Sequence, residues 1–481
     1  MTVPRIAAAG GYAPRFRVTV EAFEDAWGSF DATGIEEKAV PYADEDALTM
    51  AAAAGRRALS AGDADPGEVG FLAFTSTTPP LEEEDLTARL GEMLAIPADT
   101  EHATFGQSTR AGTQALAAGI DATFSDAPGA DADLALVIAA DCPRGEPHDE
   151  REHAAGAGAA AFVVGDEGPA AVTDRAEHAA PYPGTRFRRR GSESIEGLDV
   201  TRYDRAAFLE AIEGAVDRLD AEPPQFDAVA IQAPDGGMPY RAAGAIGVEN
   251  EAVAAYETVS ELGDAGAASV PLSLARAVAD GEDVLAASFG SGAGADALAV
   301  VCEDAVPAEI DLGGHEEVSY AEYLRLRGDV TRDDPEGGGA YVSMPTWRRS
   351  LPQRYRLVAG RCPECDALAF PPEGACDDCG NLVEYEDVAL PGTGTAEAAT
   401  TIGQGGAPPE FAVQQSKGGD FGVAVVAFDA PDGSETVSAP AQVTDGRDVD
   451  VGDRVRAAVR RIYEQEGVPR YGFKVRPADG L

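Results

Sequence analysis

Four cysteines arranged as two Cys-x-x-Cys pairs constrain the fold of this chain more than any other feature. Cys362 and Cys365 form the first pair (CPEC), and Cys376 and Cys379 form the second (CDDC) after ten intervening residues. Four thiolates at this spacing can close tetrahedrally on one Zn²⁺, with each pair held by a tight turn. The spacing therefore predicts a zinc ribbon. Its zinc is expected to be structural, because four protein ligands leave no coordination position open.

The alternative interpretation of these cysteines is a pair of disulfides, which are typical of secreted proteins. The N-terminal sequence MTVPRIAAAGGYAP lacks the basic region and apolar stretch of a signal peptide, and it reads as a first strand. The sequence also contains no run of about 18 apolar residues that would predict a membrane span. We therefore expect a cytoplasmic protein with reduced cysteines and no membrane partner.

The chain is strongly acidic, with 84 acidic and 37 basic residues and a formal net charge of −47. Lys38, Lys417 and Lys474 are its only lysines, so arginine supplies nearly all the positive charge. Such a composition is typical of a halophilic cytoplasm, where salt screens the repulsion between acidic groups. An acidic mesophilic protein is the alternative. In either case the charge argues against nucleic acid as a partner, because phosphates would be repelled.

Short apolar runs alternate with helical, alanine-rich stretches over residues 1–305. The runs are continuously apolar, which is typical of strands buried on both faces, so we predict a layered α/β domain. The strand candidates are Gly70–Thr75, Leu134–Ala140, Ala159–Val164, Ala228–Gln232, Val284–Phe289 and Ala297–Cys302. The helix candidates are Asp46–Ala61, Leu86–Leu94, Gly112–Ala122, Ala206–Leu219, Tyr240–Gly247 and Leu272–Ala279.

The rest of the chain divides into a connector, the ribbon and a β-rich end. Residues 306–350 are polar and are expected to form a linker, with one short helix around Tyr320–Arg327 and a glycine-rich turn at Asp333–Gly339. The zinc ribbon is placed at 351–382. In 383–481, apolar runs such as Phe421–Phe428 and Val455–Ile462 are separated by Gly, Pro and Asp turns, which predicts a small β-barrel.

Several motifs resemble those of known families. Those of the first domain resemble thiolase-fold condensing enzymes, most closely the archaeal 3-hydroxy-3-methylglutaryl-CoA (HMG-CoA) synthases. The matching stretches are Thr109–Leu116, Ala140–Gly158, Phe187–Gly191, Gln232–Arg241 and Ser288–Leu298. From Trp347 onward the chain resembles the zinc-ribbon and OB-fold family that accompanies archaeal thiolases and acyl-CoA enzymes. The resemblance implies a five-layered αβαβα thiolase-like domain, then a rubredoxin-like ribbon and an OB-fold barrel.

The chain departs from the synthase pattern at four positions. Where the resemblance places a cysteine nucleophile the chain has Thr109, whose hydroxyl ionises far less readily than a thiol. Gln232 stands at the position of a histidine, and an amide cannot exchange a proton. Ser76 stands at the position of a glutamate base and Asp264 at that of a substrate-orienting asparagine. One of Glu82–Glu84 could reach inward, although a solvated acidic helix start is the simpler interpretation.

The remaining candidate residues have both structural and functional interpretations. Cys142 and Cys302 end or follow apolar strands, and we expect them to be small buried residues. Arg188 and Arg189 belong to a basic cluster that either forms a solvated face or contacts the phosphates of coenzyme A. Gly292 and Gly294 lie in a glycine-rich loop that, through the resemblance, shapes the floor of the thiolase site.

These observations favour a protein that keeps an acyl-CoA cleft but has lost covalent condensing chemistry. It would act as a scaffold, with the ribbon and barrel docking it to a catalytically complete thiolase or synthase, and it would pair as a homodimer like other thiolase folds. The alternative is an active acyltransferase or acyl-CoA hydrolase with a rearranged site, in which a carboxylate such as Asp264 is the base. A nucleic-acid module is disfavoured by the charge and by the few clustered aromatic residues of the barrel segment.

Overall fold

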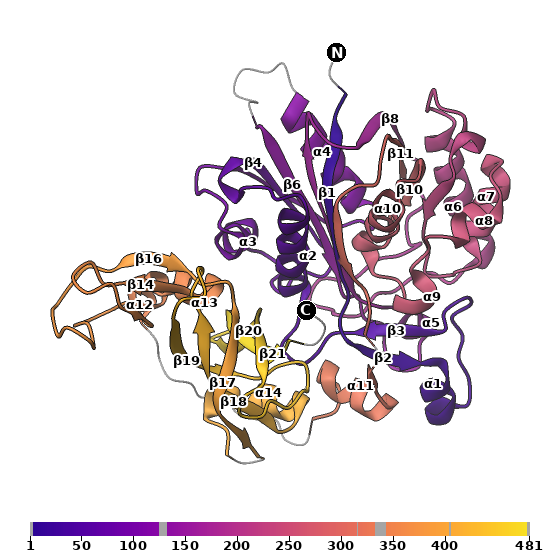
Figure 1. Ribbon diagram of the computed structural model, residues 1–481. Helices are drawn as coiled ribbons and strands as arrows, with labels where there is room; N and C mark the ends of the chain where they lie inside the picture. The colour runs from indigo at the N-terminus through magenta and orange to yellow at the C-terminus, as the bar shows by residue number, and fades with distance from the viewer. Residues whose placement is uncertain (1–2, 125–131, 315, 332–342, 404–405, 479–481) are drawn as a thin grey trace. The chain divides into compact units, whose positions relative to one another are not determined.

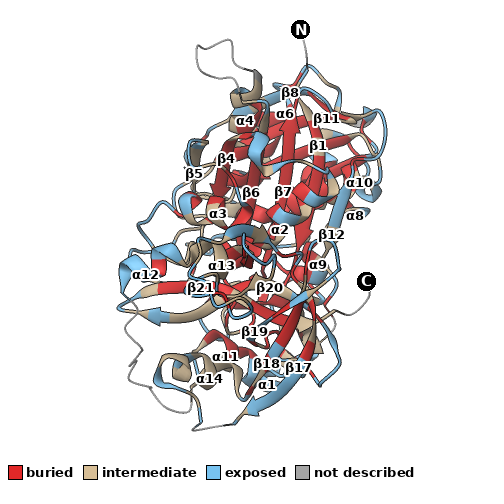
Figure 2. Ribbon diagram, turned by 60° about the vertical axis from the view of Figure 1, so that its left-hand side comes forward, coloured by how far each residue is buried: buried red, intermediate tan, exposed pale blue. Residues whose placement is uncertain are grey.

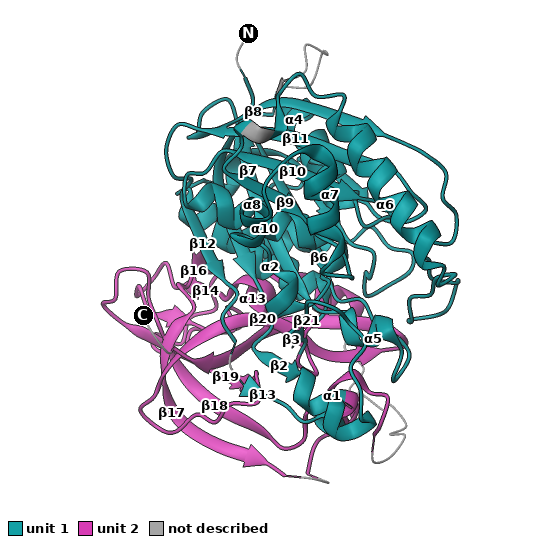
Figure 3. Cartoon of the chain, turned by 90° about the vertical axis from the view of Figure 1, so that its right-hand side faces the viewer, with its two compact units in different colours: residues 1–41, 46–323 teal, residues 42–45, 324–481 magenta. Residues whose placement is uncertain are grey.

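The chain folds into two compact units (Figure 3). The computed structural model describes residues 3–124, 132–314, 316–331, 343–403 and 406–478. Unit 1 comprises residues 1–41 and 46–323, and unit 2 comprises 42–45 and 324–481. No helix in these described ranges is long and apolar enough to cross a membrane.

Unit 1 is built on a mixed sheet of ten strands, in the order β5-β4-β6-β7-β1-β8-β11-β10-β9, with β12 added alongside β1. The sheet has two halves, because β1 and β8 pair through only two residues each. The strands are β1 (Arg5–Tyr12), β4 (Val69–Thr75), β5 (Glu101–Phe105), β6 (Leu134–Asp141), β7 (Gly158–Gly165), β8 (Ala170–His178), β9 (Ala228–Ile231), β10 (Val284–Phe289), β11 (Ala295–Cys302) and β12 (Ala308–Asp311).

Helices lie on both outer faces of these half-sheets and between them, which gives the αβαβα layers. The middle layer holds α4 (Ala111–Phe124) and α10 (Ser269–Ala279), and α10 contacts strands of both halves. One outer layer holds α2 (Ala47–Ala61) and α3 (Thr87–Leu94). The other holds α6 (Thr201–Val216), α7 (Met238–Ile246) and α8 (Asn250–Ala254), which lie together at the right of Figure 1. The thiolase-like layering expected from the sequence is confirmed.

Burial explains why continuous apolar runs form these strands. Every residue of β7 is buried, and Figure 2 shows the same in most of β1, β4 and β6. Helix α2 packs so closely on β1 that a Cβ added at Gly10 would lie 2.3 Å from the carbonyl oxygen of Ala54. Small residues therefore set the spacing of this layer, because any side chain at Gly10 would collide with helix backbone.

Unit 1 also contains a small second sheet with short helices near it. A three-stranded sheet has the order β13-β2-β3. Its strands are β2 (Phe16–Thr19), β3 (Glu37–Val40) and β13 (Glu316–Glu317), and the nearby helices are α1 (Val20–Trp27), α5 (Glu150–Ala154), α9 (Val259–Leu262) and α11 (Tyr320–Arg327). Part of the stretch expected as a polar linker thus forms strands, and α11 has the predicted bounds. The predicted turn at Asp333–Gly339 lies outside the described residues.

Unit 2 contains a ribbon and a barrel. The ribbon sheet has the order β15-β14-β16, and the barrel sheet has the order β19-β18-β17-β20-β21. A bridge between Val443 and Val475 brings the two ends of the second sheet together, so the small barrel is nearly closed, consistent with an OB-like fold. The elements are α12 (Met344–Arg349), α13 (Leu351–Arg356), β14 (Val358–Arg361), β15 (Leu368–Ala369), β16 (Glu386–Ala389), β17 (Thr393–Ile402), α14 (Ala412–Gly418), β18 (Phe421–Asp429), β19 (Thr436–Gln442), β20 (Arg454–Gln465) and β21 (Val468–Pro477).

Unit 2 encloses a cluster of buried charges. Asp44, from the short stretch 42–45, accepts a hydrogen bond from Lys474 Nζ at 2.8 Å and from Thr444 Oγ1 at 2.9 Å. Arg460 pairs with Glu45 and Asp445, each at 3.0 Å. Burial lowers the pKa of Lys474, and Asp44 opposes that shift. The barrel therefore buries cations whose compensating carboxylates come in part from residues 42–45.

Two of the three lysines are thus interior residues. Lys474 has 0% of its surface exposed and Lys38, in unit 1, has 1%. The ammonium of Lys38 donates to the hydroxyl of Tyr323 at 3.0 Å and lies over the rings of Phe23 and Tyr323. Lysine is consequently almost absent from the surface.

Candidate active site

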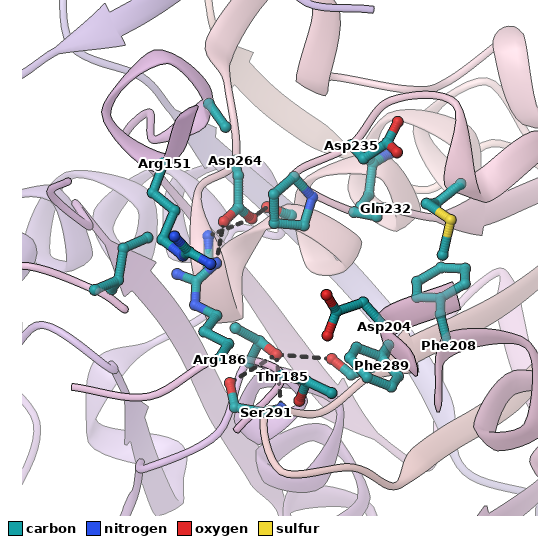
Figure 4. Close-up of a pocket in the computed structure, with 18 of the residues that line it drawn as sticks. Arg151, Thr185, Arg186, Asp204, Phe208, Gln232, Asp235, Asp264, Phe289 and Ser291 are labelled. Atoms are coloured by element: carbon teal, nitrogen blue, oxygen red, sulfur yellow. Dashed lines mark hydrogen bonds and ion pairs between the residues drawn. The ribbon is translucent and has the colours of Figure 1, made fainter. Parts of the chain in front are cut away.

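Three of the four positions at which the chain departs from the synthase pattern line one cavity of unit 1. The cavity has a volume of about 260 Å³, and Thr109, Gln232 and Asp264 contribute to its wall (Figure 4). Gln232 follows β9, Thr109 precedes α4, and Asp264 follows α9. The volume lies just below the roughly 300–1,000 Å³ of pockets for drug-sized ligands, so the cavity suits a short acyl group rather than a whole coenzyme.

The hydroxyl of Thr109 is already engaged. Its Oγ1 donates to the carbonyl oxygen of Phe289 at 2.7 Å and accepts from the backbone N–H of Ser291 at 3.2 Å. A hydroxyl becomes a nucleophile when a neighbouring base removes its proton, and a backbone carbonyl is not such a base. Thr109 is therefore held as a structural link between α4 and the loop after β10.

Gln232 carries a polar group without a partner. The side chain is 6% exposed, and within the described residues its Nε2 has no hydrogen-bond partner. A buried donor left unpaired costs roughly 1–3 kcal/mol, so such groups usually meet a water or a ligand. Gln232 can therefore donate a hydrogen bond to an oxygen atom placed in the cavity.

Asp264 is fully occupied by protein groups. It is buried and forms an ion pair with Arg186, and its Oδ1 accepts from the N–H of Gly266 at 3.1 Å and from Ser269 Oγ at 3.2 Å. The other guanidinium nitrogen of Arg186, Nη2, is buried without a partner in the described part of the chain. The sequence suggested Asp264 as a base, and in the structure its carboxylate is held by Arg186, Gly266 and Ser269.

Ser76 lies outside this cavity. It follows β4 and donates through Oγ to Asp141 Oδ1 at 2.9 Å. Asp141 is completely buried at the end of β6, and it also accepts from both the hydroxyls and the N–H groups of Thr77 and Thr78 and from the N–H of Ala267. Asp141 thus ties together the ends of two strands and the loop before α10. Asp141, which accepts a hydrogen bond from Ser76, therefore stabilises the backbone around the site.

A second, larger cavity of about 980 Å³ adjoins the first. The two share Arg186, Ile195 and Ser291 in their walls, and the larger one also contains Ser76, Arg188 and Arg189. Arg188 donates to the carbonyl oxygen of Thr77 at 2.7 Å, and Arg189 is 3.0 Å from Glu196. Both arginines are exposed. They could therefore reach the phosphates of a ligand, in competition with their present partners.

The glycine-rich loop after β10 contacts the segment that carries these arginines. The N–H of Gly292 donates to Thr185 Oγ1 at 3.2 Å, and the N–H of Tyr182 donates to the carbonyl of Gly292 at 3.0 Å. Gly292 has φ 90° and Gly294 has φ 149°, values that side chains other than glycine rarely adopt. Ser291, which lies between β10 and Gly292, lines both cavities. This loop therefore forms part of the wall that the cavities share.

The two other cysteines, Cys142 and Cys302, are partly buried and not fully buried as expected, and both are unsuited to nucleophilic chemistry. Burial raises the pKa of Cys142 to about 11 and that of Cys302 to about 11. Such thiols stay protonated near neutral pH, and the thiolate is the reactive form. Neither residue lines the cavity of Thr109.

The cavity also contains Asp204, a carboxylate to which the sequence assigned no role. Asp204 lies in the first turn of α6 and lines the cavity, and its Oδ1 is buried without a partner among the described residues. Burial and the nearby carboxylate of Asp199 raise the pKa of Asp204, while Arg151 opposes the shift. Figure 4 shows the Asp204 carboxylate directed into the cavity, across from the pair of Arg186 and Asp264.

In unit 2 the four ribbon cysteines are positioned for one metal ion. Their sulfur atoms all lie within 4.8 Å of one another, with 3.9 Å between Cys362 and Cys379 and 3.6 Å between Cys365 and Cys376. A tetrahedron with Zn–S bonds of about 2.3 Å has edges of about 3.8 Å. A disulfide needs about 2.05 Å, so the arrangement fits zinc and not two disulfides.

The two cysteine turns repeat one backbone geometry. The N–H of Asp366 donates to the carbonyl of Cys362 at 2.9 Å, and the N–H of Gly380 donates to that of Cys376 at 2.8 Å. Asp366 has φ 67° and Gly380 has φ 73°, so each turn ends on a left-handed residue. The turns direct the cysteine side chains inward, as a closed metal site requires.

Comparisons with known proteins agree with both units. Residues 349–383 match the family described as ChsH2, rubredoxin-like zinc ribbon domain. The hydroxymethylglutaryl-CoA synthase of Pyrococcus horikoshii is 32% identical over 334 residues, which cover 66% of this chain and 94% of that protein. This chain belongs to the hydroxymethylglutaryl-CoA synthase family. The synthase of Archaeoglobus fulgidus, 31% identical over 338 residues, covers 66% of this chain and 96% of its own length.

Solved structures support the same fold. The structure "MvaS in complex with 3-hydroxy-3-methylglutaryl coenzyme A" matches with a TM-score of 0.59 at 22% identity and covers 71% of this chain and 95% of that one. An HMG-CoA synthase complexed with CoA also matches with a TM-score of 0.59, at 14% identity, and covers 71% of this chain and 96% of that one. At these identities the likeness shows the fold of the synthase family, while the roles of individual residues rest on the geometry above.

Proposed function

We propose that the synthase-like unit binds a short acyl-CoA thioester without taking up its acyl group covalently. One observation carries this proposal: the hydroxyl of Thr109 is held between Phe289 and Ser291 instead of beside a base. The acyl end would occupy the cavity of about 260 Å³. The phosphates would lie near Arg188 and Arg189 in the adjoining cavity.

The chain would then act as a scaffold for acyl-CoA rather than as a condensing enzyme. The Gln232 amide can donate a hydrogen bond to a carbonyl oxygen but cannot act as an acid or a base. Asp264 is in an ion pair with Arg186. A partner thiolase or synthase would perform the chemistry, docked through the zinc ribbon and barrel, and the chain would pair as a homodimer in the cytoplasm. Co-purification from the native host, with identification of the captured proteins, tests the partnership. Light scattering at high salt tests the dimer.

The absence of covalent transfer is directly testable. We expect protein incubated with radiolabelled acetyl-CoA at molar salt to carry no label after denaturation. Thr109→Ala should bind equally well, because the hydroxyl it removes makes only internal contacts. Ser108→Ala is the matched control for the neighbouring hydroxyl. Label that survives denaturation and is lost in either variant would contradict the proposal.

The arginine assignment predicts a selective loss of affinity. Replacing Arg188 and Arg189 together by glutamine should raise the Kd for CoA about tenfold, because charge-assisted hydrogen bonds to phosphate are lost. Binding of an acyl-pantetheine, which lacks those phosphates, should not change. Arg202→Gln, at an exposed position of the same unit, is the control. Titration calorimetry at one fixed salt concentration measures the Kd of both ligands for the wild type and the two variant proteins. Equal losses for both ligands would place the phosphates elsewhere.

A further inference from the structure

The residues that line the cavity of Thr109 carry four buried polar atoms without a partner in the described part of the chain. Three are donors, Gln232 Nε2, Arg186 Nη2 and Arg205 Nε, and one is an acceptor, Asp204 Oδ1. All four residues line the same space, together with the apolar side chains of Phe208 and Phe289. Buried groups of this kind are rarely left unpaired, so their clustering indicates a ligand that brings oxygen acceptors and a hydrogen-bond donor.

A thioester with a water molecule beside it meets this description. Its carbonyl oxygen can accept from Gln232 and Arg186, while the water can donate to Asp204. Asp204 suits this task better than Asp264, because Asp264 already accepts from three protein groups. A half-buried carboxylate with an elevated pKa is a better general base near neutral pH than an ordinary surface aspartate.

We infer that a CoA thioester bound in this cavity is hydrolysed by a water molecule that Asp204 deprotonates. This rests on the proposed binding of acyl-CoA and adds a reaction to it. The water proton passes to Asp204 as the water oxygen bonds to the carbonyl carbon. The carbonyl electron pair moves to its oxygen, which Gln232 and Arg186 stabilise. When this tetrahedral intermediate collapses, the carbon–sulfur bond breaks and the thiolate takes the proton from Asp204. The products are the carboxylic acid, which ionises in solvent, and CoA as a thiol.

The reaction does not need the residues that the chain has replaced. Hydrolysis by water requires neither a nucleophilic cysteine nor a histidine to activate it. One site can therefore lack a covalent intermediate and still contain a carboxylate that deprotonates water. The sequence region that carries Asp204 also lies outside the stretches that resemble the synthase motifs.

The test measures CoA release and acyl-CoA binding on the same full-length variants. Wild-type protein should release CoA from acetyl-CoA well above the buffer rate, followed by chromatography. Asp204→Asn should lower this rate 10²- to 10⁴-fold, the usual contribution of a general base, and leave the Kd within about threefold. Gln232→Leu should lower the rate about 10²-fold, because an oxyanion donor is lost. Asp217→Asn, at the exposed C-terminal end of α6, should match the wild type.

The outcomes separate the two proposals. Binding without hydrolysis, or hydrolysis that is unchanged in Asp204→Asn, would overturn the inference and leave the proposed function intact. Failure of the wild type to bind any CoA thioester would overturn both. Retained binding by Asp204→Asn also shows that the variant is folded, so a lost rate cannot then be ascribed to unfolding.

Discussion

Replacing Asp44 by alanine is expected to destabilise unit 2 by about 3–5 kcal/mol, the usual cost of breaking a buried ion pair from one side. The change leaves Lys474, which has 0% of its surface exposed, without its carboxylate partner. It also removes one hydrogen-bond acceptor of Thr444 and the carboxylate that accepts from Gln414. Hydrogen exchange of the full chain measures the effect. The free energy of opening of the amides in β20 and β21 should be lower in the variant than in the wild type.

A double-mutant cycle separates the charge from the packing. Lys474→Met in the Asp44→Ala background should recover most of the stability, because a buried pair replaced by apolar groups is often neutral. Asp387→Ala, at an exposed position of the ribbon sheet, should change stability by no more than about 0.5 kcal/mol. Unchanged exchange in Asp44→Ala would show that residues 42–45 do not hold the barrel together.

Loss of one ribbon cysteine is expected to abolish metal binding and unfold the ribbon. Cys376→Ser removes one of four thiolates from a closed site, and structural zinc contributes about 10–16 kcal/mol of binding free energy that is coupled to folding. Elemental analysis should find one zinc per wild-type chain and almost none in the variant. Exchange protection over β14 to β16 should fall with it, because the ribbon sheet is too small to be stable alone.

The matched control for the metal is Cys302→Ser in unit 1. Its sulfur lies outside the cluster of four, so zinc content should stay at one per chain. Chelation of the wild-type protein should reproduce the loss of ribbon protection, and added zinc should reverse it. A wild-type protein purified with intact ribbon exchange and no metal would rule out zinc as the structural element.

Local pattern predicted the buried strands of unit 1 well and its half-exposed strands poorly. Val284–Phe289 is apolar except for Ser288, and β10 has those bounds. Strand β8 was missed because its second half, TDRAEH, contains few apolar residues. Its residues alternate between exposed and partly buried. Strand β5 has no fully buried residue, so its strand character comes from pairing with β4. Pairing of this kind is long-range and cannot be inferred from a short window of sequence.

The site was predictable where the resemblance to the synthase family marks positions along the chain, and unpredictable where distant loops enter it. The sequence singled out Thr109, Gln232 and Asp264, and the cavity unites them. It did not reveal that Arg186 reaches Asp264 across 78 residues of chain. Asp204 was missed because α6 begins at Thr201, five residues before the predicted start at Ala206. Its first turn is polar, and the apolar periodicity that marks the helix begins only later.

The interior position of Lys38 and Lys474 has a practical consequence for chemistry performed on the intact protein. Among the three lysine side chains, amine-directed reagents should react first with Lys417, because it is partly exposed and the other two are interior. A single dye, crosslinker or surface anchor could therefore be installed at a defined place without mutagenesis. A protease specific for lysine should likewise make its first cut there and spare the rest until the fold opens.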